Sequence, residues 1–422
     1  MQIFFLVTSE SLIGKTFSVA CQNPGIGGTE FTSIKLALLL ACKYPDLDIA
    51  LVSTNTIDLT HESKNLENII VDNLEDFLDV CSAKKDPFLI VSTMSIAISI
   101  TNQLLQKLSH KTIIWLHHPF QLVLDVKNLG CVAHVHVGEY QFHSNKDFYP
   151  SSWFIQNPFF SCATDAAKTF LPNNGVVKIV YLGALFNVKG FGHVARQWSS
   201  MKNLLPEVEL HVIGSSATYG KSPEHSLIPC ESDFAEEILK YIPLKDIEER
   251  RVVFHGNLGQ EKFEIMRSAH FAILNPTGTS EAFPASPLEC MASGLPVIAS
   301  DDYGMSDSMR FFPELTLRSP EDIPDRVRFL MSDSYRYEEL SARSVAVAAW
   351  FDSQTDVILA RWRRLFDLAA KGSVLAVPDC PPVGPLYGSR FKLKIRQIRA
   401  RLGLIKRSLF KALKNFRITK IE

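Results

Sequence analysis

Several features that define whole classes of protein are missing from these 422 residues. The eight cysteines are scattered and include no C-x-x-C pair, which favours buried thiols in a reducing cytoplasm over a disulfide framework or a zinc site. No hydrophobic run approaches the roughly 20 residues of a membrane span. The apolar residues 1–7 have no basic leader and are too short for a signal peptide. The composition therefore predicts a cytoplasmic protein.

The apolar content is sufficient for two ordinary cores. Hydrophobic residues make up 46% of the chain, and a domain size of roughly 150 residues gives two to three domains, of which we expect two. Short apolar runs alternate with helical patterns, as is typical of parallel sheets covered on both faces. The expected elements of a first series are strands at residues 3–7, 49–53, 88–92, 112–116 and 131–137 and helices at 30–43, 66–80 and 96–108.

A second series of the same kind begins near residue 176. The two series predict an α/β protein of two Rossmann-like domains, residues 1–165 and 175–375, which face each other across a cleft at the carboxyl ends of their strands. The expected elements of the second series are strands at residues 178–182, 209–213, 251–254, 271–274 and 297–299 and a helix at 193–204.

The end of the chain differs in charge from the rest. A proline-rich linker at residues 376–388 precedes residues 389–422, which hold 12 Lys and Arg and one acidic residue. Apolar residues recur there at helical spacing, which predicts an amphipathic helix on an anionic membrane surface. The alternative is that this helix docks on the acidic remainder of the same chain. Binding of the helix to nucleic acid is a third and weaker alternative. The apolar stripe consists of Ile395, Ile398, Leu402, Ile405, Leu409, Leu413 and Phe416.

Two carboxylates, Glu281 and Glu289, flank an expected helix start. A buried strand at residues 271–274 and a turn-rich loop lead to a helix at about 287–293. A helix N-terminus offers unpaired N–H groups and partial positive charge, and therefore suits an anion such as a diphosphate. Glu281 precedes this helix and Glu289 lies inside it, so the two can reach hydroxyls on either side of a diphosphate.

The order of these elements resembles the donor site of the family 4 glycosyltransferases. The run Met291-Ala-Ser-Gly-Leu-Pro296 follows the second carboxylate, as it does in this family of retaining GT-B enzymes, here of the bacterial surface-polysaccharide type. The resemblance implies that Glu281 lies against the donor sugar and that Glu289 binds the ribose hydroxyls. A capping Glu and a solvated helix Glu are the other interpretation of these two residues.

The same resemblance selects two features of the first domain. The family carries a Gly-Gly-x-Glu loop that faces donor phosphate and acceptor, and Gly27 and Gly28 match it. Simple helix packing is the alternative for such a turn. The family also has a histidine at a strand end beside the donor sugar, for which His117 is our first choice and His118 the second. A hydrogen-bonded structural histidine is the alternative for either.

The second domain begins with a segment that resembles the family's Gly-Arg-Leu followed by Lys-Gly. Lys189 takes the lysine position, which implies a contact with the donor diphosphate. Ala184 stands where the family usually has arginine, and Arg196 or a loop lysine would have to compensate. Pro284 replaces a usual glycine and cannot donate a backbone hydrogen bond. The remaining expected donor contacts are Gly183, Gly214, Gly256, Leu258, Ala285 and Ser286.

The resemblance implies a retaining hexosyltransferase that moves a sugar from a nucleotide diphosphate to a glycan or lipid-linked acceptor. We expect no cofactor and no metal, since the donor elements carry no paired-Asp motif. In the family, retention is attributed to front-face attack with the leaving phosphate as base, so that Glu281 and His117 position the reactants. The alternatives are another GT-B enzyme, such as a nucleotide-sugar epimerase, and a partner protein that has lost its chemistry. We expect the protein on the inner face of the membrane, peripherally bound.

Overall fold

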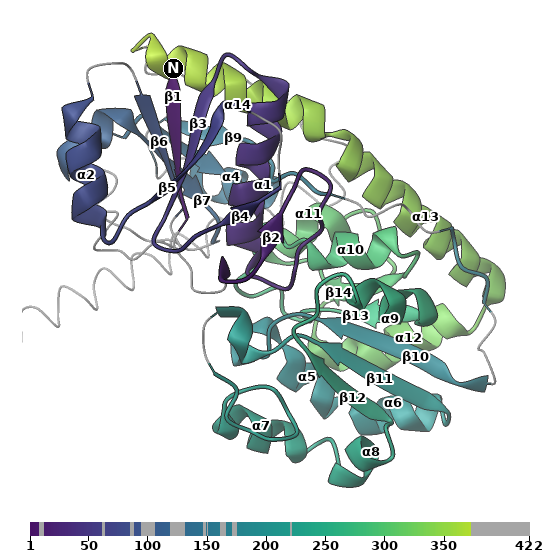
Figure 1. Ribbon diagram of the computed structural model, residues 1–422. Coiled ribbons are helices and arrows are strands. Elements are labelled where there is room, and N and C mark those ends of the chain that lie inside the picture. Colours follow the sequence, from purple (N-terminus) through teal and green to yellow (C-terminus); the bar gives the residue numbers. More distant parts are fainter. Residues whose placement is uncertain are drawn as a thin grey trace, which may run out of the picture.

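The computed structural model describes residues 1–7, 12–60, 64–84, 88–93, 106–118, 131–146, 149, 151–160, 166–170, 175–219 and 222–372. These residues form two α/β halves, each built on a parallel sheet (Figure 1). The predicted fold class of two Rossmann-like parts is confirmed. The predicted basic helix at 389–422 lies outside the described residues. Among the described helices, none is long and apolar enough to cross a membrane.

The first half is a seven-stranded sheet with β1 (Gln2–Leu6) near its centre. The strand order is β5-β3-β1-β6-β7-β8-β9, and all recorded pairs are parallel. In β7 (Thr112–Leu116) every residue is buried, as expected for a strand with helices on both faces. The other strands are β3 (Asp48–Ser53), β5 (Leu66–Ile70), β6 (Phe88–Thr93), β8 (Ala133–His136) and β9 (Ser152–Phe154). A separate parallel pair joins β2 (Thr16–Phe17) to β4 (Asp58–Leu59).

One predicted helix of this half is wrong. Residues 66–80 were expected to be helical, but they divide into the edge strand β5 and the start of α2 (Leu74–Ala83). Every residue of β5 pairs in register with β3, and this pairing outweighs the helix-like spacing of Leu66, Ile69 and Ile70. The predicted helix at 30–43 is confirmed as α1 (Gly28–Lys43). Most of the predicted helix at 96–108 lies outside the described residues.

The second half is a six-stranded sheet in the order β12-β11-β10-β13-β14-β15. Its five predicted strands are present, and the predicted helix at 193–204 is divided at Gln197 into α5 (Phe191–Arg196) and α6 (Trp198–Leu204). The strands are β10 (Val177–Leu182), β11 (Val208–Ile213), β12 (Val252–Gly256), β13 (Phe271–Ile273), β14 (Val297–Ser300) and β15 (Thr316–Leu317). The remaining helices are α7 (Ser232–Leu239), α8 (Leu244–Glu248), α9 (Lys262–Ser268), α10 (Ser286–Ala292), α11 (Ser306–Met309) and α12 (Ile323–Met331).

The last two helices return the chain to the first half. Figure 1 shows α13 (Ser334–Ser353) beside the second half and α14 (Thr355–Ala370) lying across the first. The buried face of α14 belongs to the first core, where the rings of Trp362 and Trp115 meet edge to face at 5.1 Å. Arg363 Nη1 also donates to Asp46 Oδ1 at 2.8 Å. The predicted boundary, which kept residues 175–375 in one domain, did not include this crossing.

A second link between the halves lies beside the cleft. Asp307 of α11 accepts hydrogen bonds from the backbone N–H groups of Glu139 at 2.8 Å and Tyr140 at 3.0 Å, at the start of α4 (Glu139–Asn145). Arg310 Nη1 donates to Glu139 Oε2 at 2.6 Å. Burial raises the pKa of Asp307 to about 7, although the nearby Arg310 charge opposes this shift. The two halves are therefore held together by buried polar contacts.

Candidate functional site

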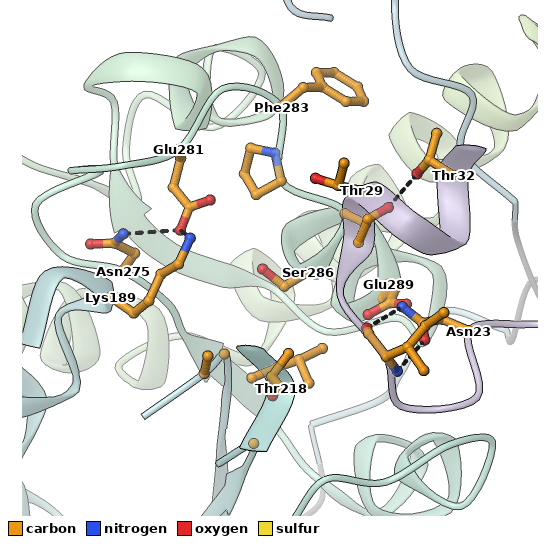
Figure 2. Close-up of a pocket in the computed structure, with 18 of the residues that line it drawn as sticks. Asn23, Thr29, Thr32, Lys189, Thr218, Asn275, Glu281, Phe283, Ser286 and Glu289 are labelled. Atoms are coloured by element: carbon orange, nitrogen blue, oxygen red, sulfur yellow. Dashed lines mark hydrogen bonds and ion pairs between the residues drawn. The ribbon is translucent and has the colours of Figure 1, made fainter. Parts of the chain in front are cut away.

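One cleft lies between the carboxyl ends of the two sheets and receives side chains from both halves (Figure 2). The first half contributes Gly28 and both histidines, and the second contributes the lysine and the two glutamates that the sequence selected. Parallel strands end at a common edge, so residues far apart in the sequence meet there. The predicted residues that line the cleft are Gly28, His117, Gly183, Lys189, Gly214, Leu258, Glu281, Ala285, Ser286 and Glu289.

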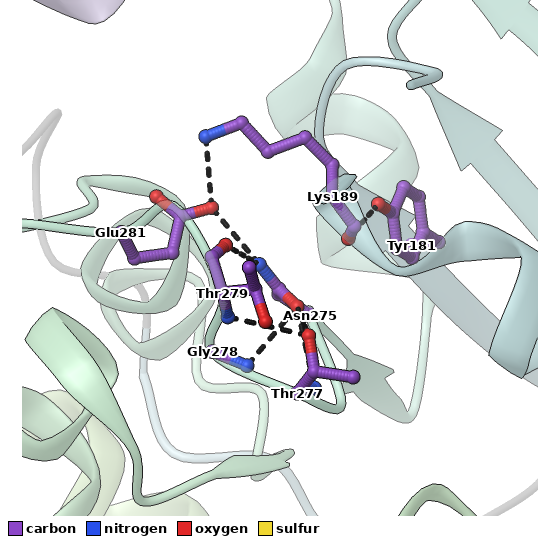
Figure 3. Close-up of polar contacts among 7 residues, drawn as sticks. All are labelled: Tyr181, Lys189, Asn275, Thr277, Gly278, Thr279 and Glu281. Atoms are coloured by element: carbon purple, nitrogen blue, oxygen red, sulfur yellow. Dashed lines mark hydrogen bonds and ion pairs between the residues drawn. The ribbon is translucent and has the colours of Figure 1, made fainter. Parts of the chain in front are cut away.

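Lys189 and Glu281 form an ion pair in this cleft. The Nζ atom of Lys189 lies 3.0 Å from Glu281 Oε1, and the two side chains are 15% and 13% exposed. Asn275 Nδ2 donates to the same carboxylate oxygen at 3.2 Å (Figure 3). The pair therefore places a cation and a partly shielded carboxylate side by side at the cleft wall.

The side chain of Asn275 organises the loop that carries Glu281. Its Oδ1 atom accepts from Thr277 Oγ1 at 3.0 Å and from the backbone N–H of Gly278 at 3.1 Å, while Nδ2 donates to Thr279 O at 2.9 Å (Figure 3). Ser280 follows with φ +66°, a left-handed conformation that is rare outside glycine. Its hydroxyl is buried and has no hydrogen-bond partner among the described residues. Such strain is typical of functional loops.

The turn that carries Lys189 packs directly on this loop. Gly190 has φ +82°, and a Cβ there would lie 2.8 Å from Pro276 Cδ, so the close approach requires glycine. The hydroxyl of Tyr181 donates to Lys189 O at 2.7 Å and fixes the backbone of the turn (Figure 3). The position of the lysine relative to Glu281 is thus set by backbone packing as well as by their ion pair.

Glu289 forms a second ion pair, with Lys262 at the start of α9. The Nζ atom of Lys262 lies 2.7 Å from Glu289 Oε1, and the side chains are 5% and 12% exposed. Both residues line the cleft. The sequence interpretation selected Glu289 but not Lys262, because the two lie 27 positions apart in sequence. The sequence did contain one indication of Lys262, which is the turn-rich segment before α9. A lysine at the start of a helix, next to a loop that is predicted to bind the nucleotide, is a candidate for the site.

Three predicted glycines mark the ends of adjacent strands β10, β11 and β12. Gly183 N donates to Ile213 O at 3.0 Å, and Gly214 N donates to Gly256 O at 2.8 Å. Gly214 has φ +137°, and a Cβ there would lie 2.1 Å from Gly183 O. Only a glycine allows this approach. Gly256 accepts this hydrogen bond from Gly214 and is not itself among the described residues that line the cleft.

The two adjacent histidines both line the cleft but have different surroundings. The ring of His117 packs against Trp115 in a tilted arrangement with ring centroids 4.4 Å apart, and its Nδ1 lies 3.4 Å from Asn157 Nδ2. Burial lowers the pKa of His117 to about 3. Its Nε2 has no hydrogen-bond partner among the described residues. His117 is therefore a partly buried ring that is neutral at physiological pH.

His118 lies in the field of the Lys189–Glu281 pair. Burial lowers its pKa, the charge of Lys189 lowers it further, and that of Glu281 opposes both. Of the two adjacent histidines, His117 thus contacts Trp115 and Asn157, whereas His118 interacts electrostatically with Lys189 and Glu281.

The glycine-rich loop of the first half reaches over to the second. A Cβ on Gly25, which has φ +88°, would lie 3.2 Å from Leu258 O. Gly28 lines the cleft, whereas Gly27 is buried beside Glu30 and is not among the described lining residues. Burial raises the pKa of Glu30. Asn23 of this loop and Glu289 both line the cleft (Figure 2).

Position 184, where the resembling family usually has an arginine, holds an alanine in this chain. Ala184 is buried and lines the cleft. Arg196, one of the two proposed replacements, instead pairs with Glu237 at 2.6 Å on the outside of α5 and is not among the described residues that line the cleft. The other proposed replacement was a loop lysine; the second lysine that lines the cleft, Lys262, lies instead at the start of helix α9.

Two Rossmann-like halves with a shared cleft at their strand ends define the GT-B architecture. Comparison with known proteins agrees with this class: residues 176–333 match the family model for glycosyl transferases group 1. That segment contains Lys189, Lys262, Glu281 and Glu289. No curated protein matches the sequence.

Solved structures of glycosyltransferases share the fold over most of the chain at low sequence identity. Sucrose-phosphate synthase from Thermosynechococcus elongatus is similar with a TM-score of 0.61 and 15% identity, covering 87% of this chain and 98% of that one. A glycosyltransferase from Rickettsia africae has a TM-score of 0.60 and 13% identity, covering 88% and 98%. Anabaena HepE in complex with UDP-glucose has a TM-score of 0.57 and 14% identity, covering 86% and 99%.

Proposed function

We propose that this protein is a retaining glycosyltransferase that moves a sugar from a nucleotide diphosphate donor to a glycan or lipid-linked acceptor. The observation that carries the proposal is the pair of carboxylates, Glu281 and Glu289, each ion-paired with a lysine in one interdomain cleft. A nucleotide sugar has hydroxyls at both ends and negative charge in the middle. A cleft with carboxylates for the hydroxyls and cations for the phosphates fits that pattern.

The ammonium group of Lys189 acts on the leaving group. When the sugar–phosphate bond breaks, the diphosphate gains a negative charge, and a preplaced cation stabilises it without reorganisation of water. Glu281, 3.0 Å from this ammonium, accepts hydrogen bonds from the sugar hydroxyls and holds the anomeric carbon in position. Neither residue has to act as a nucleophile.

The histidines contribute at the acceptor side of the sugar. Both are uncharged in this environment, because burial lowers the pKa of each. A neutral imidazole can exchange hydrogen bonds with the sugar and the acceptor without adding positive charge beside Lys189. In this mechanism the leaving phosphate takes the proton of the acceptor hydroxyl on the same face, which gives retention of configuration, and the chain supplies cations in place of a metal.

We also propose that the enzyme works on surface polysaccharide at the inner face of the membrane, where residues 389–422 would hold it beside a lipid-linked acceptor. The basis is the apolar stripe and the excess of Lys and Arg in that segment. Among the donors to test, UDP-sugars come first, because a similar structure contains UDP-glucose.

The decisive experiment measures donor turnover with and without acceptor. The purified protein is incubated with UDP-, GDP- and ADP-sugars, alone and with a glycolipid extract, and both nucleoside diphosphate release and glycolipid mass are followed. A transferase releases diphosphate and lengthens a glycolipid only when acceptor is present.

Other outcomes would overturn the proposal. A change of the donor sugar without acceptor would identify an epimerase, and no turnover with any donor would indicate a catalytically silent partner protein. NMR of the product linkage tests retention: an anomeric configuration opposite to that of the donor contradicts the front-face mechanism.

A further inference from the structure

Lys262 occupies a position where a lysine is costly. Its side chain is 5% exposed, and burial of an ammonium group is unfavourable unless it is paired and hydrogen-bonded. It is also the first residue of α9, where the partial positive charge of a helix start disfavours a cation. Its ion pair with Glu289 offsets part of this cost, yet a neutral pair at these two positions would avoid it entirely. A functional role explains why a charge is kept there.

Without Lys262, the cleft would have only one lysine among its described lining residues for a donor with two phosphates. Among the described residues that line it, the lysines are Lys189 and Lys262, and no arginine is present. Lys189 stands beside Glu281 and Lys262 beside Glu289. The loop and first turn of α10 that join these two carboxylates, including Ala285 and Ser286, line the cleft between them. A diphosphate bound along this wall would have one ammonium group at each end.

Resting on the proposed function, we propose that Lys262 is the second cation of the donor site and contacts the phosphate on the nucleoside side. An ammonium group has three N–H donors. One is directed at Glu289 Oε1 at 2.7 Å, which leaves two for phosphate oxygens. The same contact would orient the Glu289 carboxylate for the ribose hydroxyls. Lys262 thus supplies the charge that Ala184 does not, from a different element of the fold.

The competing explanation is that Lys262 only holds Glu289 in place. The two roles differ in which part of the nucleotide they affect. A lysine that merely positions Glu289 would affect nucleoside and nucleoside diphosphate equally, since both contain the ribose. A lysine that contacts phosphate would mainly affect the diphosphate. The ratio of the two affinities therefore separates the roles.

The test is isothermal titration of the full-length protein with uridine, UDP, guanosine, GDP, adenosine and ADP, after which the pair that the wild type binds best is kept. Lys262→Met removes the charge at similar volume, and Lys262→Arg retains it. We expect Lys262→Met to lower the ratio of diphosphate to nucleoside affinity at least tenfold, equivalent to about 1.4 kcal/mol, and Lys262→Arg to restore most of it.

Loss of the lysine leaves Glu289 buried without its partner, so a folding defect has to be separated from a binding defect. The comparison of Lys262→Met/Glu289→Gln with Glu289→Gln does this, because both lack the carboxylate and differ only in the ammonium group. We expect the lower ratio in the double variant. An unchanged ratio in both comparisons would overturn the role of Lys262. If the wild type bound none of the diphosphates, the proposed function itself would fail, and the two results are distinguishable.

Discussion

Replacement of Lys189 by alanine is expected to lower turnover about 100-fold or more. At an effective dielectric constant of about 20, an ammonium group roughly 4 Å from a phosphate stabilises one developing charge by about 4 kcal/mol. Water that enters the vacated space recovers part of this, and a net loss of about 3 kcal/mol corresponds to the stated factor. The effect should fall mainly on kcat, because the additional charge on the diphosphate develops in the transition state.

The assay is nucleoside diphosphate release at saturating acceptor over a range of donor concentrations. The matched control is Lys178→Ala, because Lys178 also pairs with a glutamate, Glu209, at 3.7 Å. The side chains of this pair are 33% and 32% exposed. Neither residue is among the described residues that line the cleft. The control should retain wild-type kcat. Wild-type turnover in Lys189→Ala would refute the site assignment, and an equal loss in the control would point to general damage.

Glu281 provides an internal check on this reasoning. Lys189 and Glu281 share one ion pair and would act on the same bond, so Glu281→Ala should cost a similar factor. The double variant Lys189→Ala/Glu281→Ala should then be little worse than either single variant, because residues that act as a unit are not additive. Fully multiplicative losses would show that the two side chains act independently.

Three further predictions concern the interdomain contacts and the tail. In the folded protein the pKa of Asp307 is raised to about 7, so the contribution of Asp307 to the free energy of unfolding falls as pH rises from about 4 to about 7. The Tm of Asp307→Asn relative to that of the wild type should therefore increase from pH 5 to pH 8. A Tm difference that does not change with pH contradicts the assignment. Trp362→Ala, at a fully buried site, should cost about 3–5 kcal/mol in urea unfolding, whereas Arg364→Ala on the exposed face of α14 should change little. Deletion of residues 389–422 should leave a folded enzyme that no longer sediments with anionic vesicles at low salt, and equal sedimentation of both proteins would refute the membrane role.

Much of the fold follows from the sequence because parallel strands buried on both faces are almost continuously apolar. Residues 112–116 illustrate this: the prediction matches β7 at both ends. Residues 66–80 show the opposite case, since their spacing suits a helix while pairing with β3 makes the first part a strand. The crossing of α14 was not predicted either, because an amphipathic pattern does not indicate which of two cores receives its apolar face.

The candidate site was predictable where a motif keeps its residues close together. Glu281 and Glu289 come from one loop and helix, and the structure brings both to the cleft with Lys189. The residues that pair with these two carboxylates were not predictable. Lys262 reaches Glu289 only through the packing of α9 against α10, and Asn275 acts through hydrogen bonds that exist only once its loop has closed.

The return of α14 to the first half has a consequence for the order of synthesis. The first sheet is made early on the ribosome, but Trp115 receives its partner Trp362 only after the whole second half has been translated. At about 5–20 residues per second, that interval lasts on the order of ten seconds or more. During this time the nascent first half carries an uncovered apolar face, which is a natural binding site for a chaperone. The half that is synthesised first is therefore the half that is completed last.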